Sequence, residues 1–386
     1  MSVLTEQELI HIRRHLHQIP ELALHEKQTH DFLLATIQQM NQEHLEIRPA
    51  EELAKLPTSL MVLVHGTNPQ RTIGYRTDID ALPVEEQTGL PFKSQHPGVM
   101  HACGHDIHMT VALGVLSYFS EHQPTDNLLF FFQPAEEAEN GGKQAYDLGL
   151  FAGKWRPDEF YGLHDNPQLP AGAIGCRNGT LFAGTTEINI DLTGKGGHAA
   201  YPQRANDMVV ASAALIMQIQ TIISRSIDPV KAGVITLGKF NAGTIRNVIA
   251  GHARIEGTLR GLTQTMIEHI DGRLKDICEG IARSYNCQVD LNLNQGGYWP
   301  VENNPELTKR FIDYMKNANG VNYIETSPAM TGEDFGYLLA KFPGTMFWLG
   351  VEDDSQLHSA TLKPKENAIK RGVDAITGFL TYRMQA

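Results

Sequence analysis

A short motif, His101-Ala-Cys103-Gly104-His105-Asp106, brings a thiol and two imidazoles together within five residues. Cys103 and His105 stand two residues apart, and Gly104 between them lets the chain turn tightly. A thiolate and an imidazole are good ligands for zinc and for neighbouring divalent metals. Because two ligands do not make a site, the motif predicts a metal centre only if other ligands join it from elsewhere in the chain.

Two adjacent carboxylates, Glu136 and Glu137, form the second chemical feature. Neighbouring side chains point in different directions, so one carboxylate can bind metal while the other faces a substrate. An isolated Glu-Glu pair is usually solvated surface, whereas a buried pair without a cation would repel. Beside a metal, such a pair suits amide hydrolysis, because a carboxylate can take a proton from an acidified water and return it to the leaving amine.

Further candidates follow short apolar runs directly. Asp78 and Asp80 follow one run, the two glutamates follow another, and His164 follows a third. In an open α/β sheet, functional groups gather at the carboxyl ends of strands, so we expect these side chains on one rim. A nucleophilic Cys–His enzyme fits less well, because Cys103 lies among His and Asp residues. The chain contains neither a G-x-G-x-x-G nor a Walker A motif, which gives nucleotide chemistry no support.

The elements that must position these residues predict an α/β domain with a mostly parallel sheet. Residues 6–40 place apolar side chains at helical spacing, and Pro20 interrupts them, which favours two helices over one. A helical stretch at 108–119 then lies between buried apolar runs, the pattern of strands alternating with helices. The predicted strands are 60–64, 72–75, 128–132 and 160–163.

After Gly172 the pattern changes to that of an α+β layer. Strictly alternating strands and two helices follow in the order strand, helix, strand, strand, helix, strand, which predicts a ferredoxin-like arrangement. The α/β pattern returns from Asn304. We therefore predict a discontinuous catalytic domain of residues 1–177 and 297–386, with residues 178–296 inserted as a second domain. The elements concerned are strands at 187–192, 234–237, 254–260, 289–293 and 346–349, and helices at 207–224, 263–285 and 305–317.

Composition narrows the class of protein. The chain has 386 residues, with 32 Lys plus Arg against 44 Asp plus Glu, a net charge of -12. An acidic surface repels phosphate backbones, so we expect no nucleic-acid partner. The amino terminus lacks an uninterrupted apolar core, so we expect neither a signal peptide nor a membrane anchor. Four cysteines in a chain of this length predict reduced thiols and a cytoplasmic enzyme rather than a disulfide framework.

Several motifs, in order along nearly the whole chain, resemble the M20 peptidase family and specifically its amidohydrolase branch. The resemblance implies a phosphorylase/hydrolase-like α/β catalytic domain carrying an inserted α+β lid that supports a homodimer. It also implies a metal-dependent amidohydrolase acting on a small N-acetylated amino acid; a broader N-acyl-amino-acid amidohydrolase stays open. The motifs are Arg13-Arg-His-Leu-His-Gln-Ile-Pro-Glu21, Arg76-Thr-Asp-Ile-Asp-Ala-Leu-Pro83, His101-Ala-Cys-Gly-His-Asp106, Phe132-Gln-Pro-Ala-Glu-Glu137, Gly194-Lys-Gly-Gly-His-Ala-Ala200 and Met330-Thr-Gly-Glu-Asp-Phe335.

The resemblance also implies a role for each matching residue. Glu136 matches the general base, and Asp78 matches an acid that orients a ligand histidine. His198 and Asn247 match substrate-contacting positions on the lid. A metal-retaining protein that has lost catalysis is disfavoured, because Glu136 and every expected ligand are present. The implied site holds two divalent ions, for which zinc, cobalt, manganese and nickel all remain open. Its ligands match Cys103, His105, Glu137, His164 and His358.

Overall fold

The computed structural model describes residues 3–385 and divides into two compact units. Unit 1 comprises Met1–Leu181, Glu302–Ser327 and Tyr337–Ala386, and unit 2 comprises Phe182–Val301 and Pro328–Gly336. The changes of unit at 181/182 and 301/302 fall within five residues of the predicted domain boundaries. The short segment Pro328–Gly336 groups with unit 2, which no sequence pattern indicated.

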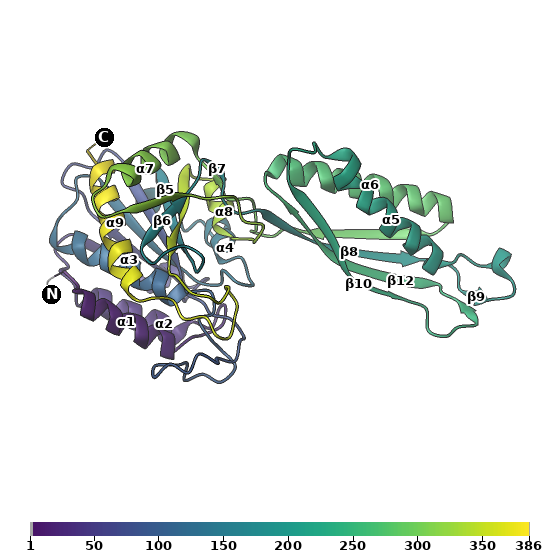
Figure 1. Cartoon of the computed structure of the whole chain (residues 1–386), viewed down its shortest axis with the longest axis horizontal. Helices are drawn as coiled ribbons and strands as arrows, with labels where there is room; N and C mark the ends of the chain where they lie inside the picture. Colours follow the sequence, from purple (N-terminus) through teal and green to yellow (C-terminus); the bar gives the residue numbers. More distant parts are fainter. Residues whose placement is uncertain (1–2, 386) are drawn as a thin grey trace. The chain divides into compact units, whose positions relative to one another are not determined.

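Unit 1 is built on an eight-stranded sheet in the order β1-β2-β4-β3-β5-β16-β6-β15. Figure 1 shows β5 and β6 of this sheet among the helices of the unit. The pairs β3–β4, β3–β5, β5–β16 and β6–β15 are parallel, which confirms the predicted mostly parallel sheet. The strands are β1 (Leu45–Ile47), β2 (Leu60–Val64), β3 (Thr72–Asp78), β4 (Asn127–Gln133), β5 (Glu159–Asn166), β6 (Ala173–Cys176), β15 (Asn322–Glu325) and β16 (Gly344–Gly350).

The helix α3 forms the centre of the unit 1 core. Almost all of its residues are buried, because it packs on the sheet through one side and on α1 and α9 through the others. Alternate residues of the strands, such as Tyr75 and Phe130, complete this core. Helices α1 and α2 are separate, which confirms the predicted break at Pro20. The helices are α1 (Glu6–Gln18), α2 (Lys27–Gln38), α3 (His105–Glu121), α4 (Gly141–Asp147), α7 (Pro305–Asn317), α8 (Phe335–Leu339) and α9 (Asn367–Arg383).

The carboxyl ends of four adjacent parallel strands carry the candidate residues. β3 ends at Asp78, and the loop after β4 contains Glu136 and Glu137. His164 lies near the end of β5, and the loop after β16 contains His358. Since β4, β3, β5 and β16 are neighbours, segments far apart in the sequence meet at one rim of the sheet.

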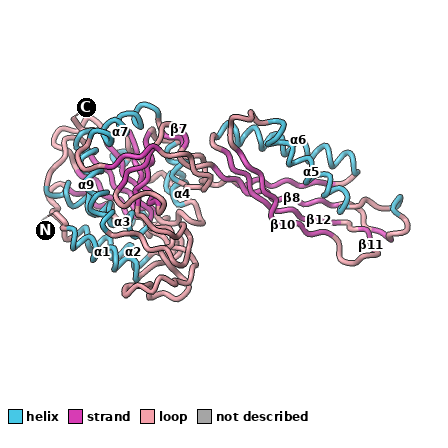
Figure 2. Tube along the Cα trace, in the orientation of Figure 1, coloured by secondary structure: helices cyan, strands magenta, loops and turns pink. Residues whose placement is uncertain are grey.

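Unit 2 is a four-stranded antiparallel sheet, in the order β10-β12-β8-β13, with two helices packed on it. Figure 2 shows these helices, in cyan, along one side of the strands. The chain order β8, α5, β10, β12, α6, β13 is the ferredoxin-like order predicted from the sequence. The elements are β8 (Gly184–Thr193), α5 (Met208–Ser226), β10 (Gly233–Ala242), β12 (His252–Gly261), α6 (Gln264–Tyr285) and β13 (Gln288–Asn294).

Short strand pairs complete the described chain. In unit 2, β9 (Gly197–His198) pairs with β11 (Val248–Ile249). Next to the unit boundary, β7 (Gly179–Thr180) pairs with β14 (Glu302–Asn303).

Among the described residues, one helix, α5, is long enough and apolar enough to cross a membrane by length and composition alone. Its mean hydropathy is 1.4. Its residues Ala211, Leu215 and Ile219 are buried against the unit 2 sheet, whereas Met217 on the same helix is exposed.

Candidate metal centre

The loop that leads into α3 turns at Gly104, which adopts a left-handed φ of +72° and occupies the N-cap position of the helix. A Cβ at this position would lie 2.5 Å from the carboxyl carbon of Asp165. Glycine is therefore required twice, by the backbone conformation and by the close approach of a buried carboxylate. This turn sends the side chains of Cys103 and His105 to the same rim of the sheet.

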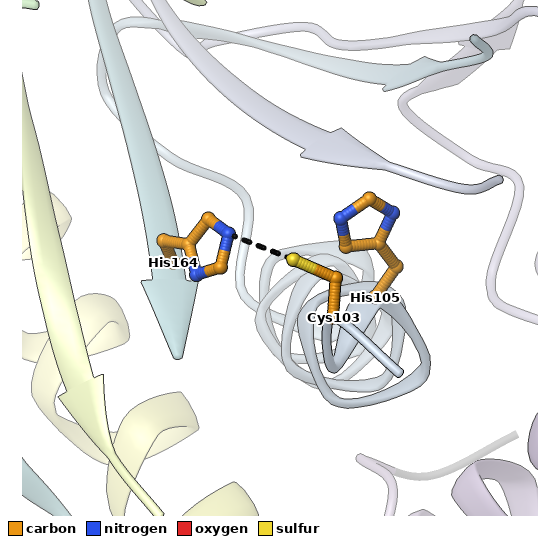
Figure 3. Close-up of side chains that lie close together, drawn as sticks. All are labelled: Cys103, His105 and His164. Carbon is orange, nitrogen blue, oxygen red and sulfur yellow. Dashed lines mark hydrogen bonds between the residues drawn. The ribbon is translucent and has the colours of Figure 1, made fainter. Parts of the chain in front are cut away.

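Cys103, His105 and His164 lie together at the start of α3 and the end of β5 (Figure 3). The Cys103 Sγ lies 3.5 Å from Nε2 of His164, at hydrogen-bond distance for a thiol donor. The other ring nitrogen of His164, Nδ1, donates to the backbone carbonyl of Asp165 at 2.8 Å. Because a carbonyl only accepts, this bond assigns the proton to Nδ1 and turns the Nε2 lone pair towards the sulfur.

His105 is held in the same way from the side away from the cluster. Its Nδ1 donates to the backbone carbonyl of Asp80 at 2.9 Å, and the Asp80 carboxylate lies 3.4 Å away. Its Nε2 lies 3.7 Å from Oδ2 of Asp78 and 3.7 Å from Oε1 of Glu137, too far for hydrogen bonds. Burial lowers the pKa of His105, but Asp78, Asp80 and Glu137 outweigh burial and raise that pKa to about 10.

Glu137 joins His358 to the cluster from the loop after β16. Its Oε1 lies 3.6 Å from Nε2 of His358, and its backbone N–H donates to Oδ2 of Asp80 at 2.9 Å. His358 has a positive φ of 66°, and its backbone N–H donates to the carbonyl of Ala102 at 2.7 Å. Burial raises the pKa of Glu137, and it also raises the pKa of the Cys103 thiol well above its usual value, with Glu137 and Asp165 adding to the effect.

These observations test whether the residues fit a cation. Among the described residues, Nε2 of His105 and Oε1 of Glu137 are buried without a hydrogen-bond partner, which is costly unless something else binds them. Two sets of ligand atoms, Cys103–His105–His164 and Cys103–Glu137–His358, each lie within 4.8 Å of one another and share the sulfur. Sulfur, nitrogen and oxygen donors in this arrangement fit divalent cations, and a cation would offset the charge that raises the thiol pKa.

Glu136 lies in the same cluster rather than away from it. Its carboxylate shares a group with His105 and Glu137 in which the ligand atoms lie within 4.8 Å of one another, and its side chain is 5% exposed. Both carboxylates therefore reach one cluster, while their separate roles stay predictions. Ala135, just before the pair, has a left-handed φ of 59°, and this bend in the chain lets both carboxylates reach the rim.

The hydrogen bonds of Asp78 are with His108 and Arg76, while Nε2 of His105 lies 3.7 Å away. Its Oδ1 accepts from Nδ1 of His108 at 2.6 Å, and its Oδ2 accepts from Nη1 of Arg76 at 2.7 Å. Burial opposes the charged form, yet His105, His108 and Arg76 hold the pKa of Asp78 well below its usual range. At Nδ1 of His105, where an orienting acid acts on a ligand histidine, the structure places Asp80.

Two further residues, His108 and Asp165, lie next to the cluster and were not predicted from the sequence. His108 bridges Asp78 and Asp165, with its Nε2 3.1 Å from the Asp165 carboxylate; burial lowers its pKa, but these two acids raise it to about 9. A helical spacing of three residues from His105 was the available signal for His108. Asp165 directly follows His164 in the sequence. Adjacent residues of a helix or strand do not share a face, so the sequence offered no reason to group the two.

His198 and Asn247 both lie in unit 2, on the β9–β11 pair and the turn beside it. His198 is the register partner of Val248, and the backbone N–H of Ala199 donates to the carbonyl of Asn247 at 3.2 Å. Both side chains are exposed. The structure thus brings these two residues close to each other within unit 2, while their roles towards a substrate stay predictions.

Comparisons with known proteins agree on one family. Residues 74–382 match the family described as Peptidase family M20/M25/M40. An N-acetyldiaminopimelate deacetylase of Limosilactobacillus reuteri (strain DSM 20016) is 80% identical over 383 residues, covering 99% of this chain and 100% of the relative. A protein of the same name from Lactobacillus helveticus (strain DPC 4571) is 75% identical over 385 residues, covering 100% of both chains.

One of the similar solved structures is described as a metal-binding protein. A Bacillus subtilis protein described as a dinuclear metal-binding peptidase from the M20 family superposes with a TM-score of 0.85. It is 27% identical and covers 98% of each chain. That protein is described as binding two metals, and in this chain the donor atoms around Cys103 fit divalent cations.

Proposed function

We propose that this chain, which belongs to peptidase family M20/M25/M40, hydrolyses N-acetyl-LL-2,6-diaminopimelate to LL-2,6-diaminopimelate and acetate. One observation carries the substrate: the near-complete match, at high identity, to curated relatives named N-acetyldiaminopimelate deacetylase. The reaction places the enzyme in the acetylase branch of bacterial lysine synthesis, and we propose that it works in the cytoplasm. The metal cluster supports the reaction type, since amide hydrolysis needs an activated water and a polarised carbonyl.

The cofactor in this proposal is a pair of divalent cations. Cys103 belongs to two of the groups of ligand atoms, so its sulfur would hold a cation together with either group. When bound, such cations polarise the amide carbonyl and lower the pKa of a water at the site. Zinc, cobalt, manganese and nickel all accept this mixture of donors. The proposed ligands are Cys103, His105, Glu137, His164 and His358.

Glu136 is the proposed general base. Its carboxylate takes a proton from the water as the water oxygen attacks the acetyl carbon, and delivers that proton to the nitrogen as the C–N bond breaks. Acetate and the free amine leave, so atoms and protons balance. The buried position of Glu136 beside His105 and Glu137 supports this assignment, because a base in a water-poor site keeps its proton for the leaving group.

The remaining predicted residues position the reactants. We propose that Asp78 acts through Arg76 and His108, which it binds directly, to keep the rim rigid around His105. His198 and Asn247 are proposed to hold the substrate from unit 2, which serves as the lid, with domain limits of 1–177, 178–296 and 297–386. Their adjacency on the β9–β11 pair supports a joint role.

A homodimer through unit 2 is part of this proposal. Helix α5 exposes Val209, Val210 and Met217, the last with 70% of its surface accessible. Among the described residues, β10 is an edge strand that pairs only with β12, and its Phe240 is exposed. Exposed apolar side chains and an open edge are features that a second copy of the chain would cover.

The dimer proposal is tested by the mass of the protein in solution. Met217→Asp places a charge in the exposed apolar face and is expected to shift the mass measured by light scattering from dimer to monomer. Lys275→Asp, at an exposed position on α6, is the matched control and should leave the dimer intact. A monomeric wild-type protein would remove the dimer from the proposal.

The substrate is tested with compounds that differ by one group. Purified protein with added divalent metal should release acetate from N-acetyl-LL-2,6-diaminopimelate at least about tenfold faster, in kcat/KM, than from Nα-acetyl-L-lysine, which lacks only the distal carboxylate. Equal or better turnover of Nα-acetyl-L-lysine or hippurate would overturn the substrate and favour a general N-acyl-amino-acid amidohydrolase.

A further inference from the structure

The amino-terminal helix α1 buries two basic side chains along with its apolar face. Arg13 is 1% exposed and His17 is not exposed at all, beside the apolar Leu9, Ile12 and Leu16. Burying basic groups is costly unless each meets a partner. The structure places both basic side chains in a network of charged groups.

The partner of both side chains is Asp106, the residue after His105. Nε of Arg13 lies 2.9 Å from Oδ2 of Asp106, and Nδ1 of His17 lies 2.7 Å from the same oxygen. The other oxygen, Oδ1, accepts from the backbone N–H of Ile107 in the first turn of α3 at 3.0 Å. Asp106 is fully buried, so the two basic side chains surround a carboxylate that is fixed to the start of α3.

The same two side chains reach the other loops that border the rim. Nη1 of Arg13 donates to Glu366 at 3.5 Å, and Glu366 is the N-cap of α9, at the end of the loop that carries His358. Nε2 of His17 lies 3.3 Å from Glu86, whose other oxygen accepts from the backbone N–H of Ser94 at 2.6 Å. One helix thus contacts the first turn of α3 and two loops, the one that follows β3 and the one that follows β16.

We propose that Arg13 and His17 are positioning residues of the metal centre, which hold Asp106 and through it the Cys103–His105 turn in the geometry that binds a divalent cation. This inference rests on the metal centre of the proposed function. The N-cap of α3 is Gly104, which has no side chain to anchor the turn, so the carboxylate of Asp106 is the side-chain anchor next to His105. A small displacement of Asp106 would shift both the thiol and the imidazole.

The test compares two buried arginines of unit 1. Arg13→Met removes the charge beside Asp106. Arg383→Met removes a similarly buried arginine that pairs with Glu159 at 3.1 Å, at the beginning of β5 and away from the carboxyl-end rim. Metal-free full-length proteins are titrated with Co²⁺ or Zn²⁺ by calorimetry, the Co²⁺ absorption spectrum is recorded, and thermal unfolding is followed in parallel.

Arg13→Met is expected to weaken metal binding at least about tenfold and to change the Co²⁺–thiolate absorption, the size of effect typical of residues that orient ligands. Arg383→Met should lower the unfolding temperature about as much as Arg13→Met does. Its metal affinity should stay within about twofold of wild type. Arg13→Lys should recover part of the affinity, because it restores the charge without the planar guanidinium. If Arg13→Met does not fold, Asp106→Asn replaces it, with the same loss expected.

Unchanged affinity in folded Arg13→Met, or in Asp106→Asn where that variant replaces it, would overturn the inference while leaving the metal centre intact. Wild-type protein that binds neither ion would instead overturn the proposed metal centre, and this inference with it. The two failures are therefore distinguishable in a single set of titrations.

Discussion

Substituting alanine for Gly104 perturbs the metal centre without touching a proposed ligand. The residue has a φ of +72°, and a non-glycine residue in the left-handed region costs about 1–2 kcal/mol. The added Cβ would also lie 2.5 Å from the carboxyl carbon of Asp165 and 2.5 Å and 2.6 Å from its two oxygens. Carbon atoms make contact at about 3.5–4.0 Å, so the carboxylate or the turn must move by roughly 1 Å.

The displaced carboxylate cannot move alone. Asp165 is buried, its side chain contacts Nε2 of His108 at 3.1 Å, and its backbone carbonyl accepts from Nδ1 of His164. A shift of roughly 1 Å in groups that position a reaction can cost on the order of 100-fold in rate. We therefore expect Gly104→Ala to reduce kcat/KM for acetate release by about 100-fold and to weaken divalent-metal binding by about tenfold.

Gly149→Ala separates the backbone strain from the steric contact. Gly149 has a φ of +75°, almost the same as Gly104, but a Cβ there would have no heavy atom within 4 Å. This control should lose about 1–2 kcal/mol of stability in chemical unfolding and keep wild-type metal affinity and turnover. If Gly104→Ala behaved like Gly149→Ala in all three measurements, the contact with Asp165 would not control the metal centre, and the reasoning would be refuted.

Three further outcomes follow from the same structure. Glu136→Gln should lower kcat by about 10²–10⁴-fold while metal content measured by emission spectroscopy stays near that of wild type; retained turnover would remove Glu136 as the base. Burial raises the pKa of Asp271 to about 6, so the native state favours its protonated form and stability is lost as pH rises from about 4 to 6. Asp271→Asn should therefore raise the free energy of unfolding by about 1 kcal/mol at pH 8, a value reduced because the side chain is partly exposed. At pH 4 the same substitution should change the free energy of unfolding little. Equal effects at both pH values would contradict this. Chelation should destabilise the protein, and free divalent metal at 100 times its dissociation constant should restore about 2.7 kcal/mol, whereas an unfolding temperature that ignores metal would argue against a bound cation in the native state.

The parts of the fold that the sequence predicted are those in which one local pattern decides the outcome. Continuous apolar runs gave the buried strands of unit 1, and strict alternation gave the half-exposed strands of unit 2. The candidate residues at strand ends followed from a general property of parallel sheets, so Asp78, Glu136 and His164 could be grouped before any contact was known.

The sequence could not show which distant residues each of these side chains contacts. Asp78 and Asp80 are two residues apart on the same motif, and only tertiary contacts decide that Asp80 meets Nδ1 of His105 while Asp78 meets His108 and Arg76. His17 is a second example: on a helix it has the spacing of a packing residue, and its contact with Asp106 joins residues 89 positions apart. Long-range ion pairs have no periodicity, so no window of sequence reveals them.

The electrostatics of the rim make a case for metal that does not depend on any relative. Glu137 and Asp165 add to burial in raising the pKa of the Cys103 thiol, and Glu136 and Asp78 act in the same direction. Glu137 is different, because burial raises its pKa while His105 and His358 lower it. Because burial and these carboxylates disfavour the thiolate, a divalent cation bound at the sulfur would favour the thiolate form of Cys103. The substrate is proposed from the relatives, whereas the cation is proposed from the donor atoms of this chain, so an experiment can contradict one proposal without the other.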